Sequence, residues 1–155
     1  MKPLPEEGGY YVETYRSKEK ITKKALPKRY KGFKTFGTTI LYLLTNETFS
    51  ALHRIRSDEI FHFYLGDPVT MLHLYPDGSS KVYTLGSEVQ KGHYVQLVVP
   101  KYTWQGCFVK KPGKFALMGT TVAPGFNFDD FQPATRENLL KQYPDRKELI
   151  QKLTR

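Results

Sequence analysis

The sequence predicts an all-β sandwich or barrel that ends in short helices, and three observations support this prediction. Nine short runs rich in β-branched and aromatic residues follow one another at roughly 8–12-residue spacing. Turn residues separate the runs, most clearly Gly-Asp-Pro at residues 66–68 and Pro-Asp-Gly at residues 76–78. No long helical period interrupts the series, which argues against folds that alternate strands with helices.

Each predicted strand is rich in Val, Ile, Thr, Tyr or Phe, which suit a pleated and half-buried surface. The predicted strands cover residues 10–17, 38–45, 49–55, 58–66, 69–75, 80–86, 94–100, 103–109 and 115–123. Their short connections are typical of sheets in which successive strands are joined by tight turns.

The end of the chain changes character and predicts two short helices packed outside the barrel. Thr135 can cap a first helical turn, and Pro144 stops it. Asp145 and Glu148 then fit a capping-box pattern ahead of further apolar residues.

Length and composition narrow the class of protein. The 155 residues suit one domain, which we expect to span residues 1–155. The sequence has no run of about 18 apolar residues and no secretory signal, so we expect neither a membrane span nor secretion. The single cysteine, Cys107, cannot form an internal disulfide and fits a reducing compartment, so we expect a cytoplasmic location.

The formal charge of +9 is concentrated near the start of the chain. Residues 1–34 contain ten basic and four acidic residues, whereas the other 121 residues contain fourteen basic and eleven acidic ones. The excess lies in RSKEKITKKALPKRYKGFK, residues 16–34, which we interpret as an exposed loop. No nucleic-acid-binding motif accompanies this stretch, so we do not expect a nucleic-acid partner.

The stretch HRIRSDEIFHFYLG, residues 53–66, places two histidines and a glutamate in a strand-like apolar run. Side chains alternate across a strand, so we expect one face to point into the barrel with His53 from the preceding strand. A buried carboxylate such as Glu59 is unfavourable unless a charged or hydrogen-bonding group meets it. His62 faces the other side, where an interstrand hydrogen bond is favoured over a catalytic role. The side chains expected on the inward face are those of Glu59, Phe61, Phe63 and Leu65.

This spacing resembles the first motif of the cupin superfamily, a group of small β-barrels. The motif reads Gly, His-any-His, three or four residues, Glu, six residues and Gly. His53 stands for the first histidine, Glu59 for the glutamate and Gly66 for the closing glycine. Ile55 occupies the place of the second histidine, so that ligand is missing.

The second cupin motif reads Pro-any-Gly, two residues and His. The segment PKYTWQ resembles it, with Pro100 in place, Tyr102 at the glycine and Gln105 at the histidine. The segments EEGGYYVETYRS, VVPKYTWQG and TVAPGFNFDDF also resemble one branch, the domain-of-unknown-function group called cupin 5. This branch usually has His-Pro before Glu-Gly-Gly, whereas Pro5 and Glu6 stand there in this chain.

The resemblance implies a cupin jelly-roll β-barrel, commonly dimeric, with a shape similar to sugar-nucleotide epimerases, but it supplies no settled activity. Among the residues themselves, His53 titrates near neutrality, and burial would raise the pKa of Glu59 towards the same range. Tyr102 adds a phenol if it points inward, which makes it the third catalytic candidate. The residues expected to contact the ligand are Gln105, Phe61, Phe63 and Trp104.

Two interpretations of function stay open. The first is an epimerase or isomerase acting on a sugar or sugar nucleotide, and the second is a non-catalytic protein that binds a small molecule. A metal-dependent oxygenase is disfavoured, because a typical cupin metal has three His and one Glu, and Ile55 and Gln105 replace two of them. We predict no cofactor, with a weakly held divalent metal at His53, Glu59 and Gln105 as the alternative.

We expect a homodimer, since barrels of this kind often pair through an N-terminal strand and YYVETYR, residues 10–16, suits that role. Arg16, Arg54 and Arg56 could hold a phosphate or carboxylate. The favoured interpretation for each is an ion pair on the surface or at the dimer interface.

Overall fold

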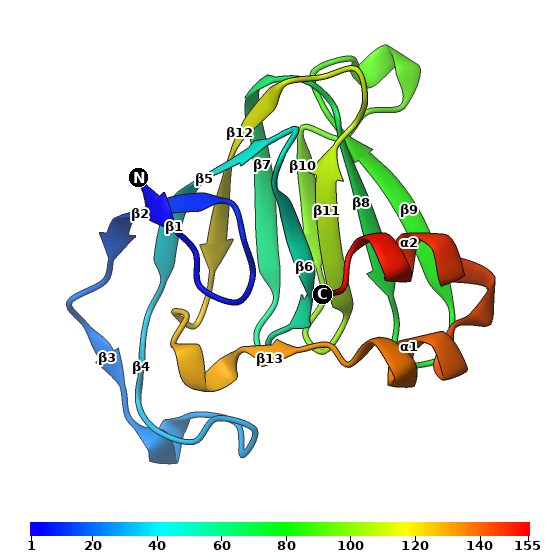
Figure 1. Cartoon of the computed structure of the whole chain (residues 1–155). Helices are drawn as coiled ribbons and strands as arrows, with labels where there is room; N and C mark the ends of the chain where they lie inside the picture. The colour runs from blue at the N-terminus through cyan, green and yellow to red at the C-terminus, as the bar shows by residue number, and fades with distance from the viewer.

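The computed structural model describes residues 1–155 and contains two antiparallel sheets that face each other (Figure 1). In spatial order, the six-stranded sheet consists of β1 (Lys2–Pro3), β2 (Tyr10–Arg16), β5 (Thr38–Thr45), β12 (Phe115–Val122), β7 (Glu59–Gly66) and β10 (Gln96–Val99). The five-stranded sheet consists of β13 (Gln132–Pro133), β6 (Phe49–Arg54), β11 (Trp104–Val109), β8 (Val69–Leu74) and β9 (Ser80–Leu85). The result is a jelly-roll barrel with short C-terminal helices, so the predicted fold class is confirmed.

All nine predicted strands form, and their ends differ from the prediction by at most two residues. Alternation is clearest in the six-stranded sheet, where one face packs on the core and the other is uncovered, as in the first half of β7. The main core lies between the sheets and consists of Tyr42, Leu44, Phe61, Phe63, Val69, Met71, Leu85, Leu97, Val99, Cys107, Val109, Ala116 and Met118. The four strands that were not predicted are β1, β3, β4 and β13, and each has only two residues.

The two helices, α1 (Arg136–Gln142) and α2 (Lys147–Lys152), cover the outer face of the five-stranded sheet (Figure 1). Their apolar side chains and those of the sheet form a second core, consisting of Leu52, Leu72, Leu74, Leu139, Tyr143, Ile150 and Leu153. The predicted capping box is wrong. Asp145 lies inside a 3₁₀ turn (Pro144–Arg146), Arg146 precedes α2, and no side chain caps either helix, not even Thr135. Packing on the sheet therefore stabilises these helices more than capping does. Neither helix has the length and apolar character needed to cross a membrane.

The outer face of the six-stranded sheet has no such cover, and it contains one departure from the predicted pattern. Phe63 pairs with Met118, but Leu65 pairs with Leu117, so Tyr64 is an extra residue that forms a β-bulge. The bulge shifts the alternation by one position. Leu65 was predicted to point inward, but its side chain is 50% exposed.

The basic stretch near the start is not simply an exposed loop, so that prediction is wrong in part. β3 (Lys20–Ile21) pairs with β4 (Lys34–Thr35), and a 3₁₀ turn (Lys23–Ala25) lies between them. We call residues 20–35 the strap. Tyr30 and Lys34 of the strap are fully buried, and the Lys34 ammonium forms an ion pair with the equally buried Asp130. An internal partner for its charge explains how a lysine from this stretch is removed from water.

Candidate functional site

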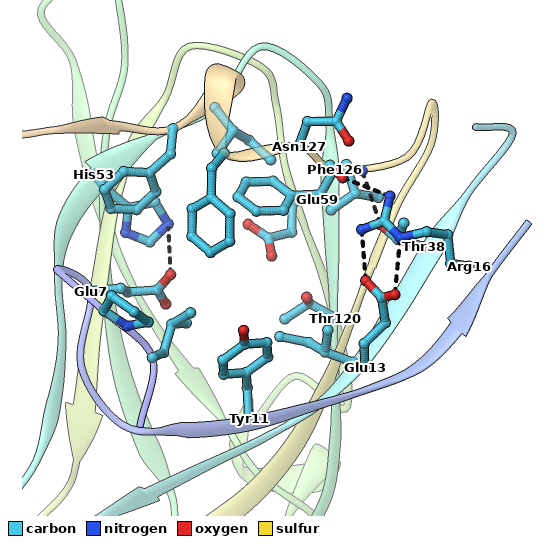
Figure 2. A pocket seen from close by; sticks show the side chains of 17 residues that line it. Glu7, Tyr11, Glu13, Arg16, Thr38, His53, Glu59, Thr120, Phe126 and Asn127 are labelled. Atoms are coloured by element: carbon cyan, nitrogen blue, oxygen red, sulfur yellow. Dashed lines mark hydrogen bonds and ion pairs between the residues drawn. The ribbon is translucent and has the colours of Figure 1, made fainter. Parts of the chain in front are cut away.

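A cavity of about 210 Å³ opens at one end of the barrel (Figure 2). Strands of both sheets, the loop between β1 and β2, and the loop after β12 supply its walls. The lining residues are Leu4, Pro5, Glu7, Tyr11, Glu13, Arg16, Thr38, Ile40, His53, Ile55, Glu59, Thr120, Val122, Phe126, Asn127, Phe128 and Phe131.

His53 is held in the cavity wall in a defined tautomer. Its side chain is buried near the end of β6, and its Nδ1 lies 2.8 Å from the carbonyl oxygen of Ala51. A carbonyl only accepts hydrogen bonds, so Nδ1 carries the proton and the Nε2 lone pair is available in the neutral ring. The ring stacks on Phe131 with a centroid distance of 5.0 Å, which fixes its orientation.

Glu59 approaches the same point from the opposite sheet. It is the first residue of β7 and is 8% exposed, and its Oε2 accepts a 2.5 Å hydrogen bond from Gln105 Nε2. Burial and the nearby Glu7 raise the pKa of the Glu59 carboxyl, while His53 and the contacts from Gln105 and Thr120 partly oppose that rise. Glu59 therefore holds a proton at higher pH than an exposed glutamate does.

Glu7 is a site residue that the sequence analysis missed. Its Oε2 lies 3.7 Å from His53 Nε2, and its Oε1 accepts a 2.8 Å hydrogen bond from the Ser50 hydroxyl. Two glycines with positive φ allow the loop to bring it there. A Cβ at Gly8 would collide with a backbone carbonyl of β6, and a Cβ at Gly9 would lie 2.8 Å from a leucine of β5. In the sequence, the Gly-Gly pair that follows Glu6 and Glu7 was the feature from which this tight loop could have been predicted.

The mouth of the cavity contains one tethered arginine. Arg16 donates two hydrogen bonds to the Glu13 carboxylate, at 2.9 and 2.7 Å, and a third to the carbonyl of Phe126 at 3.2 Å (Figure 2). The amide of Phe126 donates to the Thr38 hydroxyl at 2.9 Å. These contacts hold the aromatic loop, residues 126–131, against β2 through Arg16 and against β5 through Thr38.

With this geometry in place, comparison with known proteins identifies the family. Residues 1–134 match the family model of Cupin_5, described as Cupin superfamily (DUF985). The chain is a cupin of this family. The predicted family is therefore confirmed.

This cupin is similar to two solved structures and to one curated protein. Protein SO0799 from Shewanella oneidensis is 34% identical with a TM-score of 0.82, over 96% of this chain and 88% of that chain. A hypothetical protein from Leishmania major is 28% identical with a TM-score of 0.86, over 99% and 92% of the two chains. The uncharacterized protein YML079W of Saccharomyces cerevisiae is 29% identical in an alignment of 143 residues, which covers 87% of this chain and 71% of the yeast protein.

The cupin brings together three of the residues singled out from its sequence. His53 and Glu59 line the cavity, and Gln105 lies directly behind them, 1% exposed, with its Nε2 3.5 Å from His53 Nε2. Gln105 therefore contacts the Glu59 carboxylate rather than the cavity itself.

The other predicted site residues lie elsewhere. Phe61 and Phe63 are in the core between the sheets, deeper along β7 than the cavity. Trp104 packs against the second core and lies beneath the Arg54 guanidinium, 4.4 Å from its ring centroid. Tyr102 lines a different hollow. The aromatic wall comes instead from Phe126, Phe128 and Phe131, which follow β12.

The donors of this cupin do not fit the metal that the superfamily motif implies. No group of three or more His, Cys, Asp or Glu side chains in the structure is arranged to hold a metal ion. Ile55 has no donor atom, and the Gln105 amide turns its nitrogen, rather than the oxygen that could bind a metal, toward Glu59 and His53. We therefore derive no chemical step through a metal.

Proposed function

We propose that this cupin binds a compact, uncharged, hydroxylated molecule about the size of a single sugar ring. The observation that carries the proposal is the cavity itself. Its volume of about 210 Å³ is below the range of about 300–1,000 Å³ that is typical of sites for drug-sized ligands. A sugar nucleotide is too large for it, so only the sugar part of such a compound would occupy this space.

The polarity of the walls supports a ligand rich in hydroxyl groups. Glu7 and Glu59 present carboxyl oxygens, which accept hydrogen bonds from hydroxyls. The only cationic Lys or Arg among the lining residues is Arg16, and the Glu13 carboxylate already neutralises it. The cavity therefore disfavours anions such as phosphates. Phenylalanine rings on one wall provide an apolar surface against which the face of a sugar ring can pack.

A second candidate function, epimerisation or isomerisation, is favoured by the pairing of His53 with Glu59. The unprotonated Nε2 of His53 can accept a proton from a carbon next to a carbonyl group. Glu59, whose pKa is raised, can supply a proton to the carbonyl oxygen or to the opposite face of that carbon. The substrate loses one proton to His53 and gains one from Glu59, and proton exchange with water returns both side chains to their starting states, so the reaction needs no other reactant.

Binding is tested by calorimetry of the protein with a panel of monosaccharides. We expect saturable binding of at least one sugar and a loss of about tenfold or more in affinity in Glu59→Ala, because a charge-assisted hydrogen bond contributes about 1.5–3 kcal/mol. His62→Gln is the matched control, since His62 lies in the same strand but outside the cavity. No binding to the panel, or equal loss in both variants, would contradict the proposal.

Turnover is tested separately with the same sugars in deuterium oxide. Incorporation of solvent deuterium at a carbon position, lost in His53→Gln and retained in His62→Gln, would support the epimerase or isomerase. Binding without incorporation would leave a non-catalytic binding protein.

We also infer that the uncovered face of the six-stranded sheet pairs with a second copy of the chain. That face exposes apolar side chains, and the edge of β2 beyond Tyr11 has no strand beside it. The exposed residues on this side are Val12, Tyr15, Tyr64, Leu65 and Val98. Light scattering at micromolar concentration is expected to give a dimer mass for the natural protein and a monomer mass for Leu65→Lys/Val98→Lys. Val89→Lys, equally exposed on another surface, is expected to remain dimeric, and a monomeric natural protein would refute the inference.

A further inference from the structure

A second hollow shares Ile55 and Phe131 with the cavity but differs from it in size and charge. Its volume is about 640 Å³, which lies within the range of about 300–1,000 Å³ for small-molecule sites. The strap, the turn between β6 and β7, and the loop before β11 form its other walls. We call it the basic hollow, and its defining residues are Lys28, Arg29, Lys31, Arg54, Arg56 and Tyr102.

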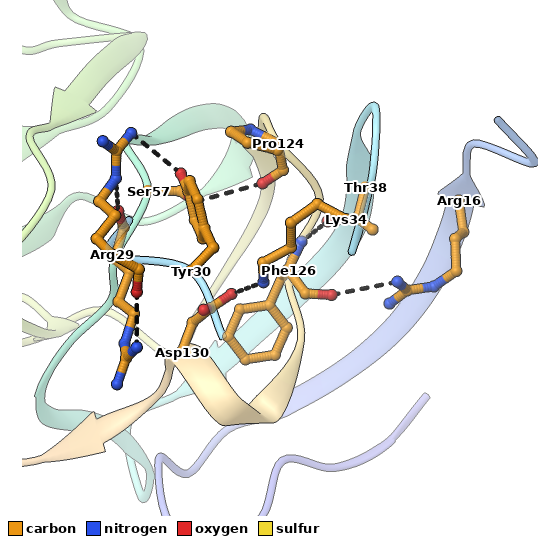
Figure 3. Close-up of polar contacts among 10 residues, drawn as sticks. Arg16, Arg29, Tyr30, Lys34, Thr38, Ser57, Pro124, Phe126 and Asp130 are labelled. Carbon is orange, nitrogen blue, oxygen red and sulfur yellow. Dashed lines mark hydrogen bonds and ion pairs between the residues drawn. The ribbon is translucent and has the colours of Figure 1, made fainter. Parts of the chain in front are cut away.

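The positive charge of the basic hollow is not balanced by the protein. None of its five Lys and Arg side chains belongs to an ion pair. Two carboxylates also line it, but the Asp130 carboxylate is already paired with the buried Lys34 (Figure 3). Only Asp129 remains to oppose five cations. A concave surface lined by like charges concentrates ions of the opposite sign. The prediction that Arg54 and Arg56 form ion pairs is therefore wrong within this chain.

Neutral contacts hold the guanidinium groups in place. Arg56 Nη1 donates to the carbonyl of Arg29 at 2.7 Å, and Arg29 Nε donates to the carbonyl of Arg56 at 3.0 Å. Arg54 Nε donates to Gln132 Oε1 at 2.8 Å, and the plane of its guanidinium rests on Trp104. Since no carboxylate is involved, the charges are fixed without being neutralised. Arg29 Nη2 also donates to the Tyr30 hydroxyl at 3.3 Å, and the N–H groups that make none of these contacts are free for a ligand.

Tyr102 provides an independent observation. Its φ of 66° lies in the left-handed region, which is unfavourable for a bulky side chain and which glycine adopts freely. Glycine is also the residue that the superfamily motif has at this place. The strained backbone directs a phenol ring to the wall of the basic hollow. A strained residue at a concave, charged surface is typical of ligand-binding sites.

We propose that the basic hollow binds the phosphate group of a small phosphorylated molecule, with the Tyr102 ring packed against the organic part of that molecule. Arginine forks match the geometry of phosphate oxygens and bind them through several charge-assisted hydrogen bonds. The proposal does not depend on what occupies the cavity that contains His53 and Glu59, because the walls of that cavity disfavour phosphate.

The test measures binding of inorganic pyrophosphate and of adenosine monophosphate to the whole protein at low ionic strength. Lys28→Gln/Lys31→Gln is expected to weaken both by about fivefold, because two favourable charge interactions are lost. Lys141→Gln/Lys147→Gln changes the net charge equally on the exposed helices and is expected to leave both affinities unchanged.

Tyr102→Gly separates binding from folding. Glycine accepts the left-handed conformation, so the melting temperature is expected to stay the same or rise, while binding of adenosine monophosphate weakens about threefold and pyrophosphate binding is unchanged. His53→Gln is expected to leave both affinities intact, which distinguishes this site from the cavity. The absence of saturable pyrophosphate binding at millimolar concentration, or equal losses in the two double-lysine variants, would overturn the proposal. Tighter binding of a 20-nucleotide single strand than of adenosine monophosphate would overturn it in favour of a nucleic-acid backbone.

Discussion

The strap and the cavity both remove ionisable groups from water, but they do so in different ways. In the strap, Lys34 and Asp130 form a matched pair, each with 4% or less of its surface exposed. In the cavity, two carboxylates face one imidazole, and the Glu7 contact to His53 is 3.7 Å long. The Lys34–Asp130 pair is therefore balanced in charge within the chain, whereas the groups of the cavity are not.

This difference distinguishes the Lys34–Asp130 pair, which stabilises the fold, from the groups of the cavity, which are suited to binding or catalysis. A matched and buried pair has little left to offer a ligand, and breaking it harms the fold. Buried groups without a balancing partner are typical of binding and catalytic sites, and in the cavity burial raises the pKa of Glu59. Substitutions in the two regions should therefore give effects of different kind and size.

The largest effect is expected from Lys34→Met. This change leaves the Asp130 carboxylate buried without a partner, which costs about 3–5 kcal/mol of unfolding free energy. Urea denaturation measures it, with the exposed Lys24→Met as control. Lys34→Met/Asp130→Leu, which removes both charges, is expected to recover most of the loss. A loss below about 1 kcal/mol in the single variant would mean that the pair is not matched as described.

A smaller and pH-dependent effect is expected from Glu59→Gln. The pKa of Glu59 is raised in the folded protein, so the unfolded chain releases this proton first. The free energy of unfolding of the natural protein therefore falls as the pH rises above the ordinary pKa of 4.5, and it levels off above the folded pKa. Between those two pKa values the fall is about 1.4 kcal/mol per pH unit. Glu59→Gln lacks this loss, so its advantage over the natural protein grows with pH.

Thermal unfolding at several pH values from 4 to 8 measures that advantage. The control is Glu47→Gln, because Glu47 is exposed and forms no ion pair. A difference in stability between Glu59→Gln and the natural protein that stays constant across this pH range would show that folding does not raise the pKa of Glu59.

The smallest effect on stability is expected from Arg16→Gln. The Arg16 and Glu13 side chains are each 38% exposed, and such pairs contribute about 0.2–1 kcal/mol. The local effect should be clearer, because Arg16 also holds the carbonyl of Phe126. Hydrogen exchange is expected to be faster at the Phe126 amide, with Lys18→Gln as the control of equal charge. Unchanged exchange there would show that Arg16 does not hold the aromatic loop.

The sequence predicted the strands and two of the cavity residues because both depend on local alternation. Glu59 points inward because side chains alternate along β7, and His53 reaches it from β6, the preceding strand in the chain, which lies in the opposite sheet. Alternation specifies the face of a strand but not the height along the barrel. For that reason Phe61 and Phe63 have the predicted face and still lie below the cavity, in the core.

The remaining site features arise from tertiary contacts that no local pattern encodes. Glu7 enters the cavity because a loop folds over β6, and Leu65 turns outward because of a bulge at Tyr64. Burial of Lys34 depends on Asp130, which is distant in sequence. From composition alone, the whole basic stretch, residues 16–34, was predicted to be an exposed loop.

The two glycines beneath Glu7 set a limit for protein engineering. Any side chain at Gly8 or Gly9 meets backbone or core atoms and also disfavours the local φ. A library that aims to change the specificity of the cavity should keep these positions invariant. Diversity is better placed at Phe128, a lining residue whose side chain is 57% exposed.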